Sequence, residues 1–258
     1  MGRQRCSISF LASFVTAIAL LASGCAQPSS DTAERSPETT DVADDTRAAP
    51  SPITAAADAG RDASSYQAAT PPKNADAPVI VMLGDSLTAG YGLAAEYALP
   101  AQLQRQFPDA RFINAGVSGD TSGGGLDRYE WSVKGADADM VVICLGANDY
   151  LRGVSPTTME ANIRALIDKA RADEIEVVLV GLAPRGDGLE SAYTDVYGKL
   201  SKEYNLPLYP AILDGVRDAP DLLQSDGLHP TAAGVAFIAD KLGAFLKPHV
   251  AALTAETP

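Results

Sequence analysis

The chain has 258 residues, of which 46% are hydrophobic, a size that suits one domain with shorter segments attached to it. Its 33 acidic and 20 basic residues give a net charge of −13 without a basic run, which disfavours binding to nucleic acid and docking on anionic lipid. Two histidines and three scattered cysteines make no convincing metal site or disulfide framework, and we expect no metal and no cofactor.

The chain begins with a segment that is typical of an export signal. Arg3 and Arg5 form a basic start, residues 8–21 are apolar, and the small residues 22–24 lead to a cleavage site. The apolar stretch is shorter than the roughly 20 residues that a transmembrane helix needs. We therefore expect the protein to leave the cytoplasm.

The signal ends at a cysteine. The sequence Leu21-Ala-Ser-Gly-Cys25 resembles a bacterial lipobox, in which the cysteine is lipidated and becomes the first residue of the mature protein. Because Leu21 stands one position further from Cys25 than in the usual motif, ordinary cleavage to a soluble periplasmic protein stays open as an alternative. Ala26, rather than an aspartate, follows the cysteine, so the resemblance implies an anchor in the outer membrane of a Gram-negative bacterium. Membrane contact is then expected only through the lipid on Cys25.

Residues 26–77 are rich in alanine, serine, threonine, proline and aspartate. Their only large apolar side chains are those of Val42, Ile53 and Tyr66. Such a segment buries too little surface to offset the entropy of ordering it, and we expect a disordered tether. As a flexible coil it would reach about 40 Å.

From residue 78 onward, short apolar runs alternate with segments that have a helical pattern. Strands are predicted at Val79–Leu83, Arg111–Asn114, Met140–Leu145, Ile175–Gly181 and Leu206–Tyr209. Helices are predicted at Ala98–Phe107, Leu126–Lys134, Thr157–Ala172, Glu190–Tyr204 and Thr231–Leu246. Strands that are separated by helices indicate a parallel sheet covered on both faces. We expect residues 78–258 to form one α/β domain with a flavodoxin-like, doubly wound sheet of five parallel strands in the order 2-1-3-4-5.

Polar residues follow three of these strands at the point where each strand ends. Ser86 lies in Gly-Asp-Ser-Leu after the first strand, a glycine-rich stretch at residues 116–125 follows the second, and Asn148 follows the third. In the expected order the first strand lies between the other two, so Ser86 would be flanked by Gly119 and Asn148. Backbone N–H groups and a side-chain amide are suitable donors for a developing oxyanion. Each segment alone is also typical of an ordinary turn or helix cap.

Two histidines are available as a base. His249 lies near the end of the chain, in a segment that we expect to be a polar tail, whereas His229 lies in Asp-Gly-Leu-His-Pro together with Asp226. A serine nucleophile needs a base for its proton and a carboxylate that orients the base, and His229 and Asp226 provide both. Pro230 suits the first position of the last helix, which would place His229 at the helix cap.

Taken together, these segments resemble the four sequence blocks of the SGNH or GDSL hydrolase superfamily. The blocks are Gly-Asp-Ser-Leu at 84–87, Gly119 in Ser-Gly-Asp-Thr-Ser, Asn148 in Gly-Ala-Asn-Asp, and Asp226 with His229 in Asp-Gly-Leu-His-Pro. The longer strings around Ser86 and Asn148 are similar to the bacterial group of arylesterases, acyl-CoA thioesterase I and lysophospholipase L1. The GxSxG nucleophile elbow is absent, which argues against an α/β-hydrolase fold.

The resemblance implies a role for each matching residue. Ser86 would attack an ester or thioester carbonyl, His229 would take its proton, and Asp226 would orient the imidazole. The backbone N–H groups of Ser86 and Gly119 and the amide of Asn148 would hold the oxyanion.

The same resemblance implies a small-molecule or lipid ester as the substrate, in the class of aryl esters, acyl thioesters and lysophospholipids, and we expect a monomer. A deacetylase of envelope or extracellular polysaccharide is an alternative, because the superfamily also contains such enzymes. A non-catalytic envelope lipoprotein that binds lipid or protein partners is an alternative of another class.

Overall fold

The computed structural model of the protein describes residues 77–182 and 189–256. The predicted export signal, Cys25 and all but the last residue of the predicted tether lie outside the described residues. Among the helices of these two ranges, none is long and apolar enough to cross a membrane.

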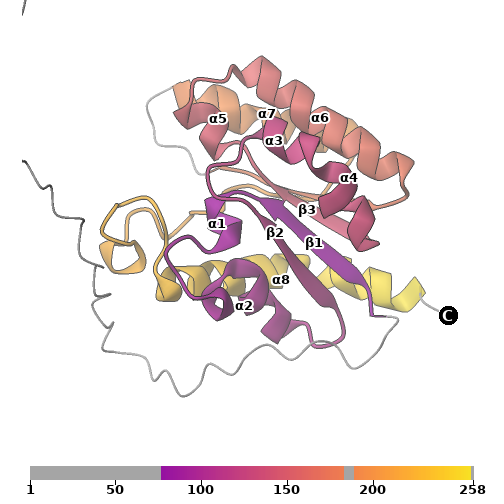
Figure 1. Ribbon diagram of the computed structural model, residues 1–258, viewed down its shortest axis with the longest axis horizontal. Coiled ribbons are helices and arrows are strands. Elements are labelled where there is room, and N and C mark those ends of the chain that lie inside the picture. The colour runs from indigo at the N-terminus through magenta and orange to yellow at the C-terminus, as the bar shows by residue number, and fades with distance from the viewer. Residues whose placement is uncertain (1–76, 183–188, 257–258) are drawn as a thin grey trace, which may run out of the picture. The chain divides into compact units, whose positions relative to one another are not determined.

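The fold is built on one sheet of five parallel strands (Figure 1). The strands are β1 (Val79–Gly84), β2 (Arg111–Gly116), β3 (Met140–Cys144), β4 (Glu176–Val180) and β5 (Leu208–Tyr209). Their order is β2-β1-β3-β4-β5, which confirms the predicted order 2-1-3-4-5. Gly84, the last residue of β1, pairs with Gly116 of β2 and Cys144 of β3, so the three strands end at the same edge of the sheet.

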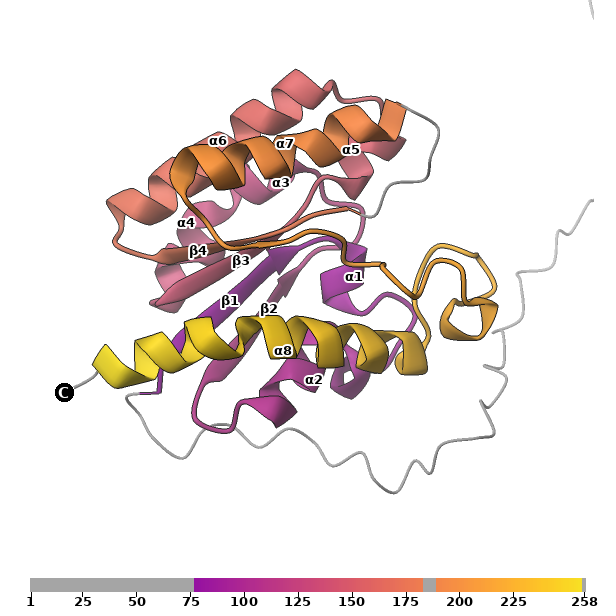
Figure 2. The same ribbon diagram turned by 180° about the vertical axis from the view of Figure 1, so that it is seen from behind.

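Helices cover both faces of the sheet, as Figures 1 and 2 show from opposite sides. The α-helices are α1 (Ser86–Ala89), α2 (Leu99–Gln106), α3 (Ser122–Asp127), α4 (Tyr129–Ser132), α5 (Ala147–Leu151), α6 (Pro156–Ala172), α7 (Leu189–Tyr204) and α8 (Ala232–Glu256). Short 3-10 helices occupy Ala95–Tyr97, Lys134–Ala136 and Pro220–Leu222. Helices α3, α4, α6 and α7 lie on one face, and α2 and α8 lie on the other.

The core follows from the alternation of side chains along β1. Val81 and Leu83 point to the layer of α6 and α7, whereas Ile80 and Met82 point to the layer of α2 and α8. All four side chains are fully buried, because the strand has helices on both sides. This explains why β1 is a continuous apolar run instead of an alternating one.

The end of the chain differs from the prediction. Helix α8 does not stop at Leu246 but continues through Pro248 to Glu256, so the expected polar tail is helical. Beyond the proline, Val250 is buried and Leu253 packs against the same core cluster as Leu246. This continued apolar stripe offsets the cost of a proline inside the helix. His249 is part of this helix, and its ring lies 5.4 Å from that of Phe245.

Candidate active site

Ser86 lies at the edge of the sheet where β1 ends. The chain turns sharply there, because a Cβ atom on Gly84 would lie 2.0 Å from Thr88 Oγ1. Asp85 caps the short helix α1, since its Oδ1 accepts the Leu87 N–H at 3.0 Å. Ser86 is therefore the first residue of a helix, and the N–H groups of a first helical turn have no partner within the helix.

The structure brings Ser86, His229 and Asp226 into one chain of hydrogen bonds. His229 Nε2 is 2.9 Å from Ser86 Oγ, and His229 Nδ1 is 2.6 Å from Asp226 Oδ2. A neutral imidazole with its proton on Nδ1 satisfies both contacts, because Nδ1–H donates to the carboxylate and Nε2 accepts from the serine hydroxyl. This geometry allows His229 to remove the Ser86 proton.

Asp226 is held as a carboxylate by its surroundings. Its Oδ1 accepts the backbone N–H groups of Leu228 at 2.9 Å and His229 at 3.0 Å. Burial by itself would raise the pKa of Asp226, but the hydrogen bonds from His229 and Leu228 outweigh this effect and lower the pKa to about 2. The tight loop between the two residues passes through Gly227, whose φ is +65°. Asp226 therefore carries a negative charge next to His229 Nδ1 at neutral pH.

His229 does not lie at a helix cap, and the prediction based on Pro230 is wrong. Helix α8 begins at Ala232, and Thr231 Oγ1 accepts the Gly234 N–H at 3.2 Å. Pro230 instead forms an isolated antiparallel bridge with Leu223. The reason is that Asp226 already binds the N–H of His229, which fixes a turn before the helix starts.

Gln224 holds the loop that contains Asp226 and His229, a role that the sequence alone did not predict. Its backbone N–H donates to His229 O at 2.7 Å, and its Nε2 donates to Tyr91 O at 2.8 Å and to Pro230 O at 2.9 Å. The Tyr91 ring packs on the His229 ring with centroids 4.4 Å apart. The one sign of this role in the sequence is that Gln224 stands two residues before Asp226.

Gly119 and Asn148 lie beside Ser86, as the order of the strands predicts. Gly119 has a φ of +81°, which favours glycine. Asn148 Nδ2 donates to Asp120 O at 2.9 Å and makes a longer contact of 3.4 Å with Asp85 Oδ2. Both residues line the same cavity as Ser86 and His229. Gly119 and Asn148 thus form part of the wall of the cavity that contains Ser86.

The cavity at this site has a volume of about 270 Å³. Its walls are mainly apolar and are formed by Leu87, Leu151, Leu182, Ile212, Leu213 and Leu228. At the rim, Tyr91 and Leu151 are each 52% exposed. The cavity can hold an apolar group next to the Ser86 hydroxyl, and it opens to solvent.

The buried carboxyl group of Asp85 and the buried thiol of Cys144 lie close to the site, but neither is part of the hydrogen-bonded chain from Asp226 to Ser86. Burial raises the pKa of Asp85 to about 6, against the hydrogen bond from the Leu87 N–H. That hydrogen bond makes Asp85 the N-cap of α1. Burial also raises the pKa of the Cys144 thiol, which makes it a poor nucleophile. Within the described ranges, no group of three histidine, cysteine, aspartate or glutamate side chains could hold a metal ion.

Asp149, which follows Asn148, is fully buried and joins two helices. Its carboxylate accepts the Ser122 N–H at 2.8 Å and the Ser122 hydroxyl at 2.5 Å. Ser122 Oγ in turn accepts from Asn162 Nδ2 at 3.0 Å. This contact fixes the start of α3 to α5, the helix that carries Asn148.

The chain is similar to known hydrolases in both sequence and structure. Residues 82–237 match the GDSL-like Lipase/Acylhydrolase family. The chain is 36% identical over 180 residues to the Escherichia coli (strain K12) protein named thioesterase 1/protease 1/lysophospholipase L1, covering 68% of this chain and 86% of that protein. It is 35% identical over 183 residues to esterase TesA of Pseudomonas aeruginosa, covering 68% and 91% of the two chains. The crystal structure of AlinE4, described as an SGNH-hydrolase family esterase, aligns with a TM-score of 0.56 at 35% identity and covers 70% of this chain and 98% of its own.

Proposed function

This chain belongs to the GDSL-like lipase/acylhydrolase family and is a hydrolase of the SGNH type, and on that premise we propose that it cleaves carboxylic esters and thioesters through an acyl-enzyme on Ser86. The observation that carries the proposal is the hydrogen-bonded chain from Asp226 through His229 to Ser86 at the edge of an apolar cavity. Family membership favours this enzyme over the non-catalytic lipoprotein.

The reaction begins when Ser86 Oγ attacks the substrate carbonyl carbon and its proton moves to His229 Nε2. The resulting imidazolium is stabilised by the Asp226 carboxylate at Nδ1. The negative charge on the carbonyl oxygen is met by the N–H groups of Ser86 and Gly119 and by the amide of Asn148. Collapse of the intermediate breaks the bond to the alcohol or thiol, which leaves with the proton from His229. Water, deprotonated by His229, then attacks the acyl-enzyme. The second intermediate collapses as the bond to Ser86 Oγ breaks, His229 returns the proton to Ser86 Oγ, and the acid is released.

The apolar walls support an acyl chain as the group that enters the cavity. Leucine and isoleucine side chains offer dispersion contacts and no hydrogen bonds, so a hydrocarbon chain fits them better than a sugar does. The relatives carry the names thioesterase, lysophospholipase, esterase and arylesterase. We therefore place aryl esters, acyl thioesters and lysophospholipids among the substrates of this chain.

We also propose that the enzyme works outside the cytoplasm as a monomer, with Cys25 lipidated in the outer membrane. The support is the signal pattern at residues 1–25 and the acidic tether that follows it. Fractionation of cells that express the full chain tests the anchor, because Cys25→Ala should move the protein from the membrane to the soluble fraction. Membrane association that survives this substitution would argue against the lipid.

The experiment for the activity compares three proteins on p-nitrophenyl esters, a fatty-acyl thioester, a lysophospholipid and an acetylated glycan. We expect the wild type to cleave the acyl substrates and Ser86→Ala to lose at least about 10⁴-fold in kcat/KM. Ser118→Ala is the matched control, since Ser118 lines the same cavity while His229 Nε2 forms its hydrogen bond with Ser86. It should retain activity within about threefold.

Two results would contradict the proposal. Hydrolysis that persists in Ser86→Ala would show that Ser86 is not the nucleophile. Activity of the wild type on the acetylated glycan alone would favour the polysaccharide deacetylase.

A further inference from the structure

We propose that Arg128 and Asp120 act as a positioning pair for the oxyanion site, in which the buried guanidinium holds the loop whose backbone carbonyl orients the Asn148 amide. The inference rests on the proposed esterase function and concerns how the same site is built. Neither charged side chain is expected to touch the substrate.

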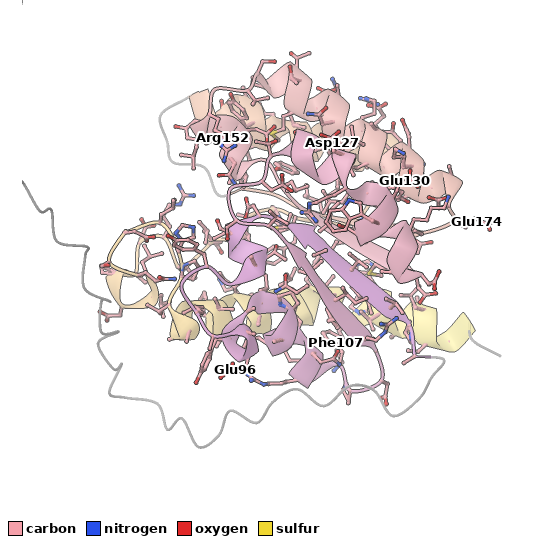
Figure 3. All side chains as sticks on the ribbon, viewed as in Figure 1. Glu96, Phe107, Asp127, Glu130, Arg152 and Glu174 are labelled. Carbon is pink, nitrogen blue, oxygen red and sulfur yellow. The ribbon has the colours of Figure 1, made fainter. Side chains whose placement is uncertain are left out.

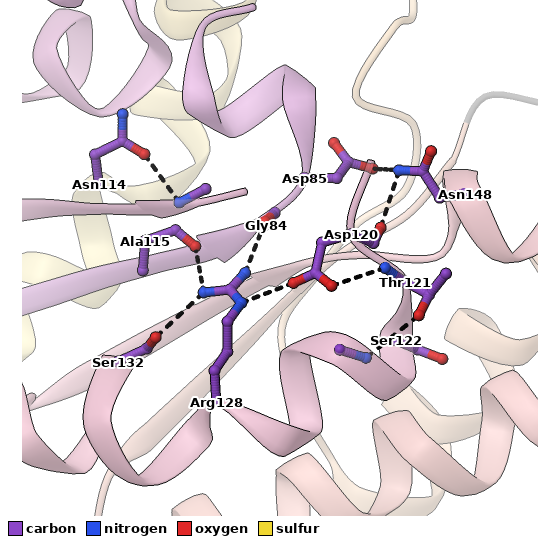
Figure 4. A network of polar contacts seen from close by, with 12 residues as sticks. Gly84, Asp85, Asn114, Ala115, Asp120, Thr121, Ser122, Arg128, Ser132 and Asn148 are labelled. Atoms are coloured by element: carbon purple, nitrogen blue, oxygen red, sulfur yellow. Dashed lines mark hydrogen bonds and ion pairs between the residues drawn. The ribbon is translucent and has the colours of Figure 1, made fainter. Parts of the chain in front are cut away.

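Arg128 is the centre of a network that Figure 4 shows from close by. Its Nη2 donates to Gly84 O at 2.8 Å, its Nη1 donates to Ala115 O at 2.7 Å, and its Nε donates to Asp120 Oδ2 at 2.7 Å. One guanidinium thus joins the ends of β1 and β2 to the loop that contains Gly119. The rigid, forked geometry of arginine makes this possible, and lysine cannot reproduce it.

The burial of Arg128 is unusual for its position in the chain. Arg128 lies between α3 and α4, and its neighbours Asp127 and Glu130 are exposed on the surface (Figure 3). Arg128 itself is 6% exposed. A charge that loses water must be compensated by hydrogen bonds, so the position of the guanidinium is tightly defined by its acceptors.

Asp120 connects this buried charge to Asn148. Its carboxylate faces Arg128, its N–H donates to Val117 O at 3.0 Å in the turn around Gly119, and its carbonyl oxygen accepts Asn148 Nδ2 at 2.9 Å. A shift of Asp120 therefore moves the Asn148 acceptor and the turn that carries the Gly119 N–H. Two of the three oxyanion donors depend on this one residue.

The Asn148 amide has two hydrogens, and each of them faces a different oxygen atom. One hydrogen is held by Asp120 O at 2.9 Å, which fixes the plane of the amide. The other hydrogen faces Asp85 Oδ2, which lies 3.4 Å from Asn148 Nδ2. This interaction is weak, and a substrate oxyanion can replace it. Asp120 thereby leaves one N–H of Asn148 available in a defined direction.

The glycine-rich sequence of α3 provides independent support. A Cβ atom on Gly124 would lie 1.8 Å from Asp120 Oδ1, so the carboxylate occupies space that only a glycine leaves open. Gly125 has a different neighbour, because its Cβ would lie 2.2 Å from Leu145 Cδ1. The position of the Asp120 side chain thus explains why residue 124 is a glycine.

A double-mutant cycle between Asp120→Asn and Asn148→Ala tests the proposal, with kcat and KM measured on p-nitrophenyl acetate. Asp120→Asn keeps the size of the side chain but removes the charge that faces Arg128. We expect kcat to fall about 10- to 100-fold and KM to change less than about threefold. Asn148→Ala should lower kcat about 10²–10³-fold. Adding Asp120→Asn to it should cost at least about threefold less than Asp120→Asn costs in the wild type, because only the Gly119 N–H is then left to be displaced.

Ser132→Ala is the matched control. Ser132 Oγ accepts from Arg128 Nη1 at 3.3 Å, on the side away from Asp120, so its loss changes the surroundings of the same guanidinium. It should leave kcat within about twofold of the wild type. If Asp120→Asn does not fold, as judged by circular dichroism, Arg128→Lys takes its place in the cycle with the same expectation.

The outcomes separate this inference from the proposed function. If the wild type cleaves the ester and Ser86→Ala does not, the function stands. Additive losses in the cycle, or an unchanged kcat in folded Asp120→Asn, would then overturn the positioning role alone.

Discussion

Replacing Asp85 by asparagine should stabilise the protein near neutral pH. Asp85 is 2% exposed, and its carboxyl lies in an environment that raises its pKa from 3.8 to about 6. Asparagine keeps the oxygen that caps α1 by accepting the Leu87 N–H, and it carries no charge to desolvate. It gives up the long contact with Asn148 and the charge interaction with His229.

The magnitude and the sign follow from the two pKa values. Between pH 4 and pH 6 the folded protein keeps a proton on Asp85 that the unfolded chain has lost, so stability falls as the pH rises through this window. A shift of about two pH units corresponds to roughly 3 kcal/mol at about 1.4 kcal/mol per unit. The free energy of unfolding of Asp85→Asn should therefore exceed that of the wild type by about 1–3 kcal/mol at pH 7.5 and match it at pH 4.

Urea unfolding of both proteins at several pH values between 4 and 7.5 measures this difference. Asp226→Asn serves as the contrast, because the Asp226 pKa is lowered to about 2 and its contribution to stability is lost only below pH 4. A difference between Asp85→Asn and the wild type that does not grow with pH would refute the reasoning.

Three further substitutions test other parts of the structure. Asp226→Asn should lower kcat about 10²–10⁴-fold in steady-state ester hydrolysis, because His229 loses its orienting carboxylate, and a loss below tenfold would speak against that role. Gly116→Ala should cost about 3 kcal/mol or more in thermal unfolding, since the new Cβ would lie 2.3 Å from Ala89 N; an unchanged melting temperature would contradict this. Tyr197→Phe should cost about 1–3 kcal/mol in urea unfolding, because the buried Leu145 carbonyl loses the Tyr197 hydroxyl, and equal stability would show that this hydrogen bond contributes nothing.

The place of Ser86 could be predicted because it depends on a local pattern, and the strand order could be predicted because alternating strands and helices indicate a doubly wound fold with a known order. A buried apolar strand followed by turn residues defines where each loop emerges, and parallel strands end at one edge of the sheet. Ser86, Gly119 and Asn148 therefore meet as expected from the order of their strands.

The surroundings of these residues could not be predicted, because they depend on contacts between distant parts of the chain. Arg128 donates to Gly84 O, a residue 44 positions away, and nothing in a helical segment shows that its arginine turns inward. The course of α8 beyond Pro248 depends on burial of Val250 by the rest of the core, which outweighs the local preference of proline. The sequence shows a glycine at position 124, but not why a glycine is required there. The structure shows that the Asp120 side chain occupies the space that a Cβ atom would need.

The central claim is that Ser86 is a nucleophile activated by His229. Labelling of the folded protein with a fluorophosphonate probe, followed by intact-mass measurement and peptide mapping, tests it directly. We expect one adduct, located on Ser86, that is absent from Ser86→Ala and forms at least about 10²-fold more slowly in His229→Ala. An adduct on another residue, or a labelling rate at Ser86 that does not depend on His229, would contradict it.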